Sequence, residues 1–220
     1  MNDAMHYEGL DLRRVEEVGL NALQTQRQLF YDGWLLRVSP GKARRARSVN
    51  AYFGSTLPLA QKIEYCERLY EQRDLPVLFR ITPFLQPPEL EAALTARGYE
   101  AFDTTLVQLC RLKRPPETPD PADFVVTAPA ADAFADAVAL LQGSSPQQRD
   151  AYYERLKESP LTTRALAAHI DGKPVGVGTV MLEDGLAGVF SMATHRTSCI
   201  VAHMGMGTWR HACVPAGRRQ

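Results

Sequence analysis

Three apolar runs separated by two Asp-Gly pairs predict a three-strand antiparallel meander in the second half of the chain. The runs are ALAAHI from Ala165, PVGVGTVML from Pro174 and LAGVFSMAT from Leu186. The pairs Asp171-Gly172 and Asp184-Gly185 favour two-residue hairpin turns, because such turns need positive φ, which Gly adopts without strain.

The first half alternates between helical and strand patterns. Apolar residues at helical spacing predict helices over Leu10–Leu23 and Pro58–Arg73, and the segment ELEAALTARG, which ends at Gly98, predicts a shorter one. Branched and aromatic residues predict strands. These are Gln28–Val38, with a turn or bulge at Asp32-Gly33, the segment SVNAYF, Leu75–Ile81 and Tyr99–Leu112.

A proline-rich stretch divides the chain. Residues 113–123 (KRPPETPDPAD) contain four prolines and almost nothing to bury, which is typical of a linker. After it we expect a strand at Phe124–Thr127, a helix with Phe134 and Val138 on one face, and a helix capped by Ser144 or Ser145. The predicted domains are therefore residues 1–112, the linker 113–123, and residues 124–220.

Composition limits the function classes. The chain is 45% apolar and 23% charged, with a net charge of zero, which argues against bulk binding to nucleic acid or an anionic membrane. No run approaches the roughly 18 apolar residues of a membrane span, and the N-terminus lacks the pattern of a secretory signal. Four widely spaced cysteines fit no metal or disulfide framework. We expect a cytoplasmic protein with reduced thiols.

Several residues could carry chemistry, and structural roles compete with each functional one. Cys66 lies on an apolar helix face and favours a core position over a nucleophile. The basic residues at 42, 44, 45 and 47 could hold a phosphate or form a solvated hairpin tip. Of the neighbouring Tyr152 and Tyr153, one can pack while the other faces a cleft. The spacings of the histidines at 169, 195, 203 and 211 match no metal site.

The order of strand, two helices and meander resembles the GNAT superfamily of N-acetyltransferases. The segment GKPVGVGTVMLEDGLAGVFSMATH, Gly172 to His195, carries the resemblance. The first half, especially DGWLLRVSPGKARRARSVNAYFGSTLPL, is similar to the degenerate first repeat of two-domain members. The resemblance implies an α/β fold of the α+β type, with mixed, mostly antiparallel GNAT-like sheets flanked by helices in two tandem repeats.

The resemblance also implies acetyl-CoA as co-substrate. Its pantetheine arm would bond to main-chain groups of Met192 and Thr194 on the fourth strand of the repeat. Its pyrophosphate would sit on the following loop, at Arg196, Thr197 and Ser198. Two positions of that loop that are glycine in the family hold Cys199 and Val201, so the hydroxyls of Thr197 and Ser198 would have to act as donors instead.

The segment after His195 departs further from the family. We expect the second repeat to be incomplete at its C-terminus, without the fifth strand, fourth helix and last two strands. The hypothesis that this tail is out of frame is tested by translating the other two frames of the DNA.

The sequence therefore predicts an acetyl-CoA-dependent N-acetyltransferase acting on a primary amine of a small molecule or peptide. The alternative is a non-catalytic GNAT-like protein that binds a ligand or partner. The family reaction uses a carboxylate or ordered water as base, but Glu183 and Asp184 lie in a turn, and no catalytic residue is assigned. Whether a homodimer completes the site stays open, as does a composite sheet in which the first repeat covers the Leu186–Thr194 strand.

Overall fold

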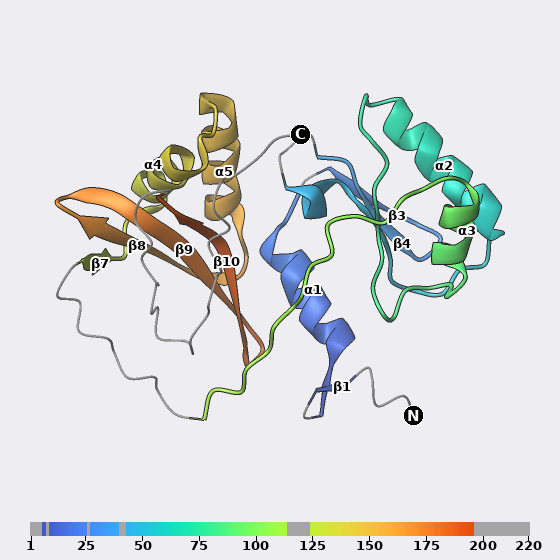
Figure 1. Ribbon diagram of the computed structural model, residues 1–220, viewed down its shortest axis with the longest axis horizontal. Helices are drawn as coiled ribbons and strands as arrows, with labels where there is room; N and C mark the ends of the chain where they lie inside the picture. Colours follow the sequence, from blue (N-terminus) through green and yellow to red (C-terminus); the bar gives the residue numbers. More distant parts are fainter. Residues whose placement is uncertain (1–5, 8, 26, 40–42, 114–123, 196–220) are drawn as a thin grey trace, which may run out of the picture. The chain divides into compact units, whose positions relative to one another are not determined.

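The computed structural model describes residues 6–7, 9–25, 27–39, 43–113 and 124–195 (Figure 1). The chain separates into two compact units, Met1–Leu106 and Val107–Gln220. Each unit has its own four-stranded sheet, with strand orders β3-β4-β5-β6 and β10-β9-β8-β7.

Unit 1 begins with a short hairpin and continues as a mixed sheet with three helices. Its elements are β1 (His6–Tyr7), β2 (Leu10–Asp11), α1 (Leu12–Ala22), β3 (Gln28–Tyr31), β4 (Trp34–Arg37), the 3-10 helix η2 (Arg44–Arg47), β5 (Val49–Ala51), α2 (Leu59–Glu71), β6 (Phe79–Arg80) and α3 (Leu90–Ala96). Strands β3, β4 and β5 pair antiparallel, and β6 joins β5 in parallel.

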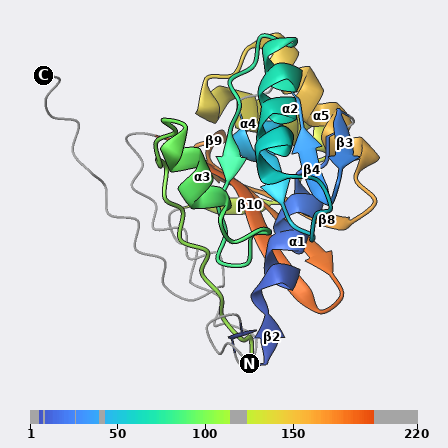
Figure 2. The same ribbon diagram turned by 90° about the vertical axis from the view of Figure 1, so that its right-hand side faces the viewer.

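Alternation along β4 places helices on both faces of this sheet. Trp34 and Leu36 belong to the core that the sheet forms with α2 and α3, whereas Leu35, between them, packs in a second cluster with Leu20 of α1. Successive strand residues point to opposite faces, so unit 1 has three layers. Figure 2 shows α2 in front of β4.

Unit 2 is a meander with two helices on one face. Its elements are β7 (Val125–Thr127), α4 (Ala131–Gln142), α5 (Pro146–Glu158), β8 (Thr162–Ile170), β9 (Lys173–Glu183) and β10 (Leu186–Thr194). All neighbouring strands are antiparallel. Both Asp-Gly turns form as predicted, with positive φ at each Asp and Gly. Ser145 caps α5 in a reciprocal capping box with Gln148.

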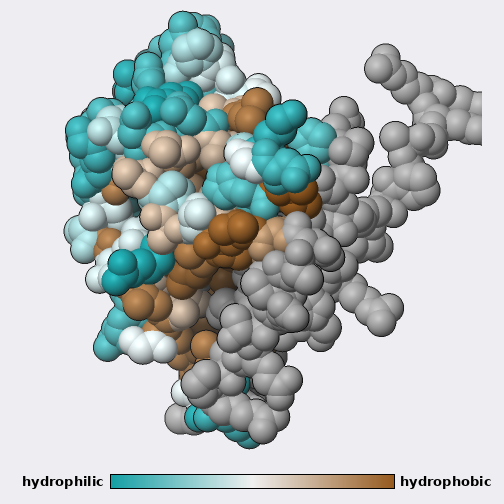
Figure 3. Space-filling model, turned by 90° about the vertical axis from the view of Figure 1, so that its left-hand side faces the viewer, coloured by the Kyte–Doolittle hydropathy of each residue, from teal (hydrophilic) through white to brown (hydrophobic). Residues whose placement is uncertain are grey.

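The helical face of the unit 2 sheet is packed with small residues. Phe134 and Val138 of α4 pack against Ala167 and Val177, with Ala193 at the edge of the cluster. Apolar surface is also exposed in this unit, on the side shown in Figure 3. The exposed apolar side chains of its strands are Val125, Val126, Leu182, Val189 and Met192.

Two strand predictions in the first half are wrong. Residues 99–112 form no strand, because Asp103 adopts positive φ and pairs with Arg44 while the Tyr99 ring packs edge-on against Phe79. The strand predicted at Leu75–Ile81 shortens to β6. Asp74, just before it, also has positive φ, and Pro76 has no N–H to donate.

No helix in the described part of the chain is long and apolar enough to cross a membrane.

Of the predicted linker, only Lys113 lies within the described residues.

Candidate functional site

The open edge of β10 is the first feature of the candidate site. Within the described residues β10 pairs only with β9, so its other edge is open there. The His195 N–H donates to the Val175 carbonyl at 2.9 Å, and hydrogen-bonded and non-bonded pairs alternate in an antiparallel ladder. The pair Thr194/Gly176 is therefore non-bonded, and the main-chain N–H and C=O of Thr194 point away from β9.

A β-bulge interrupts β10 halfway along this edge. The register passes from Phe190 opposite Thr179 to Ala193 opposite Val177, so that Ser191 and Met192 together face Gly178. Ser191 has φ of 54°, a value rare for a residue with a side chain. By the same alternation, Met192 also turns its main-chain groups outward. A bulge of this kind re-aims backbone groups and is over-represented beside functional sites.

Thr179 supports the bulge from β9. Its side chain is 1% exposed, and its hydroxyl donates to the Phe190 carbonyl at 3.1 Å, at the residue where the bulge begins. This bond satisfies a carbonyl that the disturbed ladder would otherwise pair poorly. Thr179 of β9 therefore stabilises the bulged part of β10 through this hydrogen bond.

Small residues flank the bulged edge. Gly178 faces the bulge and Gly176 faces Thr194. A Cβ added at Gly176 would lie 3.7 Å from the Cβ of Ala168, an ordinary contact. The outer face of β9 thus presents little side-chain bulk next to the exposed main chain, which lets a ligand approach closely.

Tyr152 brings a polar group to the same place from α5. Its ring packs with Phe134, at a centroid distance of 6.3 Å, and beside Ala193. Its hydroxyl is buried and has no hydrogen bond of normal geometry to any described residue. Burial raises the pKa of Tyr152, and the neighbouring Ser191 side chain partly offsets that rise. A buried phenolic hydroxyl therefore lies beside Ser191 of the bulge.

Cations of α5 lie beside both tyrosine rings. The Arg155 guanidinium is 5.1 Å from the Tyr152 ring centroid, and burial lowers its pKa. Tyr153 is flanked by the cations of Arg149 and Lys157, at 5.4 and 5.0 Å from its ring centroid. Of the two tyrosines, Tyr152 packs against the core, as the sequence allowed.

The structure describes two of the five predicted cofactor residues. Met192 is 45% exposed and Thr194 is also exposed, both on the open edge strand. Arg196, Thr197 and Ser198 lie outside the described residues, as do Cys199 and Val201.

The other sequence candidates are structural. Cys66 is fully buried, and burial raises its pKa to about 12, which confirms a core role. Glu183 ends β9, and Asp184 occupies the following turn. In the basic cluster, Arg44 pairs with Asp103 and Arg45 turns inward toward the Gly19 carbonyl. The cluster is therefore not a free hairpin tip. Lys42 lies outside the described residues.

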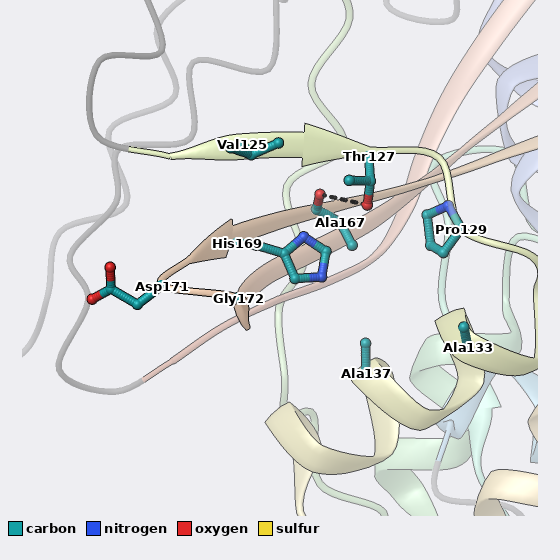
Figure 4. Close-up of a pocket in the computed structure, with 9 residues that line it drawn as sticks. All are labelled: Val125, Thr127, Pro129, Ala133, Ala137, Ala167, His169, Asp171 and Gly172. Carbon is teal, nitrogen blue, oxygen red and sulfur yellow. Dashed lines mark hydrogen bonds between the residues drawn. The ribbon is translucent and has the colours of Figure 1, made fainter.

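No group of three or more metal-ligating side chains occurs in the described ranges. A cavity of about 450 Å³ lies between α4 and the β7–β8 edge rather than beside β10 (Figure 4). Neighbouring strands are about 4.8 Å apart, so this cavity lies two strand spacings, roughly 10 Å, from the open edge. The β10 edge is the candidate site, because main-chain donors and acceptors are exposed together there.

Sequence analysis missed the bulge, the support from Thr179, and the position of Tyr152. A signal for the bulge was present. Phe190 and Ala193 both belong on the helical face of the sheet, yet three positions separate them instead of an even number. Tyr152 had no comparable signal, because its place under β10 depends on how α5 packs.

Comparisons with known proteins agree with this fold. No protein-family profile matches the chain. An uncharacterised N-acetyltransferase of Bacillus subtilis, YobR, is 26% identical over 185 residues, which cover 81% of this chain and 72% of that protein. The solved structure of a GCN5-related N-acetyltransferase from Kribbella flavida superimposes with a TM-score of 0.51 at 13% identity, covering 86% of this chain and 74% of that one.

The meander with its bulged third strand and the two preceding helices define a protein of α+β class with a GNAT-type sheet. The chain therefore has a GNAT-type fold, and it is similar in sequence to an N-acetyltransferase.

Proposed function

We propose that this protein binds acetyl-CoA along the open edge of β10 and transfers the acetyl group to a primary amine of a small molecule or peptide. The observation that carries the proposal is the bulge at Ser191–Met192 on a strand whose outer edge is open within the described residues. The proposed setting is the cytoplasm, where acetyl-CoA is available.

The main chain of β10 suits an extended amide-containing ligand. Met192 and Thr194 direct N–H and C=O groups outward, so a pantetheine arm can pair with them as an added strand would. Gly176 and Gly178 have no side chains, so a ligand can approach closely next to this edge. The fit therefore rests on backbone geometry and not on charged side chains.

The bulge is where the proposed transfer would occur. Acetyl-CoA supplies an activated acyl group, and an amine held beside its carbonyl carbon needs orientation more than additional chemistry. The Tyr152 hydroxyl is buried beside Ser191 of the bulge. We propose that it hydrogen-bonds to the bound acyl carbonyl.

Isothermal titration with acetyl-CoA and with free CoA tests the proposal. We expect dissociation constants in the micromolar range, with acetyl-CoA bound more tightly. Replacing Thr194 by Pro removes an outward N–H without breaking a bond to β9, since Thr194/Gly176 is a non-bonded pair. The variant should bind acetyl-CoA about 2- to 10-fold more weakly, the effect of one hydrogen bond.

Ala187→Pro is the matched control, because Ala187 also lies at a non-bonded position of β10 but beyond the bulge. It should bind acetyl-CoA like the native protein. Absence of heat and of a thermal shift at millimolar acetyl-CoA would overturn the proposal and favour a non-catalytic role. Transfer to an amine is then measured as released CoA thiol.

A further inference from the structure

The cavity between α4 and the strands β7 and β8 lies away from the β10 edge (Figure 4). Its volume is about 450 Å³, within the usual range of small-molecule sites. Space arises because α4 presents Ala133 and Ala137 here, one turn apart, while Phe134 and Val138 fill the neighbouring core. Val125 lines the cavity although 65% of it is exposed, so a ligand would cover apolar surface.

His169 is the polar group of this cavity whose hydrogen-bonding capacity is unused. Figure 4 shows its ring pointing from β8 into the space above Ala137. The Thr127 hydroxyl, also in the lining, already donates to the Ala167 carbonyl at 3.4 Å. Nδ1 of His169 is sealed from solvent with no partner in the described part of the chain, whereas Nε2 is not sealed.

The environment of Nδ1 selects a tautomer. A neutral imidazole has one N–H and one acceptor nitrogen. A buried N–H without a partner is rarer in proteins than an under-satisfied acceptor. The proton is therefore assigned to Nε2, the nitrogen that solvent can reach. Asp171 also belongs to the lining, but Figure 4 shows its carboxylate directed away from the space between His169 and Ala137. That space thus offers one hydrogen-bond donor, Nε2 of His169, among mainly apolar side chains.

We propose that this cavity binds a small, uncharged, mostly apolar molecule whose carbonyl, ether or hydroxyl oxygen accepts a hydrogen bond from Nε2 of His169. The molecule's apolar body covers Val125 and rests on Ala133 and Ala137. The site is separate from the acetyl-CoA edge, and its occupancy does not depend on the proposed acetyl transfer.

Two matched probes test the donor. 4′-Fluoroacetophenone carries a carbonyl oxygen where 4-fluoro-α-methylstyrene carries a methylene group, and the two have nearly the same shape. Fluorine NMR titration should show saturable binding of both to the native protein, with the ketone bound about 2- to 10-fold more tightly. Equal affinities, or no saturable binding of either probe, would overturn the proposal.

Three variants locate the site. His169→Phe keeps the apolar contact but removes the donor, so the two probes should bind equally. Ala137→Phe fills the cavity and should abolish binding of both. Ala151→Phe makes the same substitution at an exposed position of α5 and should leave both affinities unchanged. Persistent binding to Ala137→Phe places the probes elsewhere and rejects the proposal.

Discussion

The outer edge of the third meander strand is paired in unit 1, whereas in unit 2 it is open within the described residues. In unit 1 that strand is β5, and a parallel strand, β6, closes its edge through the pairs Val49/Phe79 and Asn50/Arg80. In unit 2 the corresponding strand is β10, which is longer, bulged, and open at its edge within the described residues. A closed edge has its main-chain groups already paired, so only unit 2 offers a strand to which a ligand can add.

The two units also differ in the size of the side chains that fill their cores. Unit 1 buries large side chains completely, including Trp34, Tyr70 and even Lys62. The Lys62 ammonium lies 4.0 Å from the Trp34 ring centroid and donates to the Asp32 carbonyl at 2.5 Å. Unit 2 fills its sheet face with Ala167, Val177 and similar small residues. Unit 1 therefore has a core of large, fully buried side chains, whereas the sheet face of unit 2 is lined by smaller ones. The idea that the two units are repeats stays a prediction.

The largest expected effect comes from emptying each core in turn. Trp34 and Phe134 are both fully buried and belong to separate clusters. Replacing either by Ala should cost about 3–5 kcal/mol of unfolding free energy. Because the cores are separate, Trp34→Ala should raise hydrogen exchange in α2 and spare β9, while Phe134→Ala should do the reverse. Equal loss of protection in both elements would show that the units unfold as one.

The Asp-Gly turns give a second, smaller contrast. A Cβ on Gly33 would lie 2.3 Å from the Gly54 carbonyl oxygen, whereas one on Gly172 would meet nothing within 4 Å. Both glycines have positive φ, which costs a residue with a side chain about 1–2 kcal/mol. Gly172→Ala should cost that much, and Gly33→Ala clearly more. Urea unfolding measures both, and equal costs would mean that the Gly54 backbone moves aside.

These turns also show how far sequence can predict this fold. Asp171-Gly172 and Asp184-Gly185 are short-range signals, so the meander and its residue bounds followed from local chemistry alone. The stretch from Tyr99 to Leu112 has equally strong strand propensity, yet it forms no strand. Asp103, in its middle, adopts positive φ, which breaks an extended strand, and its side chain pairs with the distant Arg44.

The candidate site was predictable from the sequence to about the same extent as the fold. The edge role of Met192 and Thr194 followed from family resemblance, and their main-chain directions followed only from the observed register. The place of Tyr152 under the bulge depends on the packing of α5 on the sheet, which no local pattern encodes.

A smaller effect is expected from protonating Asp32 of unit 1 at low pH. The Asp32 carboxylate accepts hydrogen bonds from the Leu57 N–H, at 2.9 Å, and from the Thr56 N–H and hydroxyl. These bonds, with that from Leu57 foremost, hold the pKa of Asp32 well below its usual range. The folded form therefore releases this proton more readily than the unfolded chain. Stability from Asp32 is present above the unfolded pKa of about 4 and is lost as pH falls below it.

Asp32→Asn measures that contribution, because Asn tolerates the positive φ at this position. The difference in urea midpoint between native protein and variant should shrink as pH falls from about 5 toward 2. Thr56→Val removes one donor and should shift the loss to higher pH. A difference that stays constant with pH would mean that Asp32 is not held ionised by these contacts.

The smallest effect should come from two buried tyrosine hydroxyls, one in each unit. The Tyr70 hydroxyl donates to the Arg37 carbonyl at 2.6 Å, whereas the Tyr152 hydroxyl is buried and makes no hydrogen bond of normal geometry within the described ranges. Removing a satisfied hydroxyl costs about 1 kcal/mol, while removing an unsatisfied one recovers its desolvation cost. Tyr70→Phe should therefore lower the urea midpoint, and Tyr152→Phe should leave it unchanged or raise it.

The same pair separates stability from function. If the Tyr152 hydroxyl donates to a bound acyl carbonyl, Tyr152→Phe should lose most of the preference for acetyl-CoA over CoA while folding normally. Tyr70→Phe, although less stable, should keep that preference, because its hydroxyl is already paired inside unit 1. An unchanged preference in Tyr152→Phe would leave the open edge of β10 as the binding element but remove Tyr152 from the site. A destabilised Tyr152→Phe would instead mean that its hydroxyl has a partner within the folded protein.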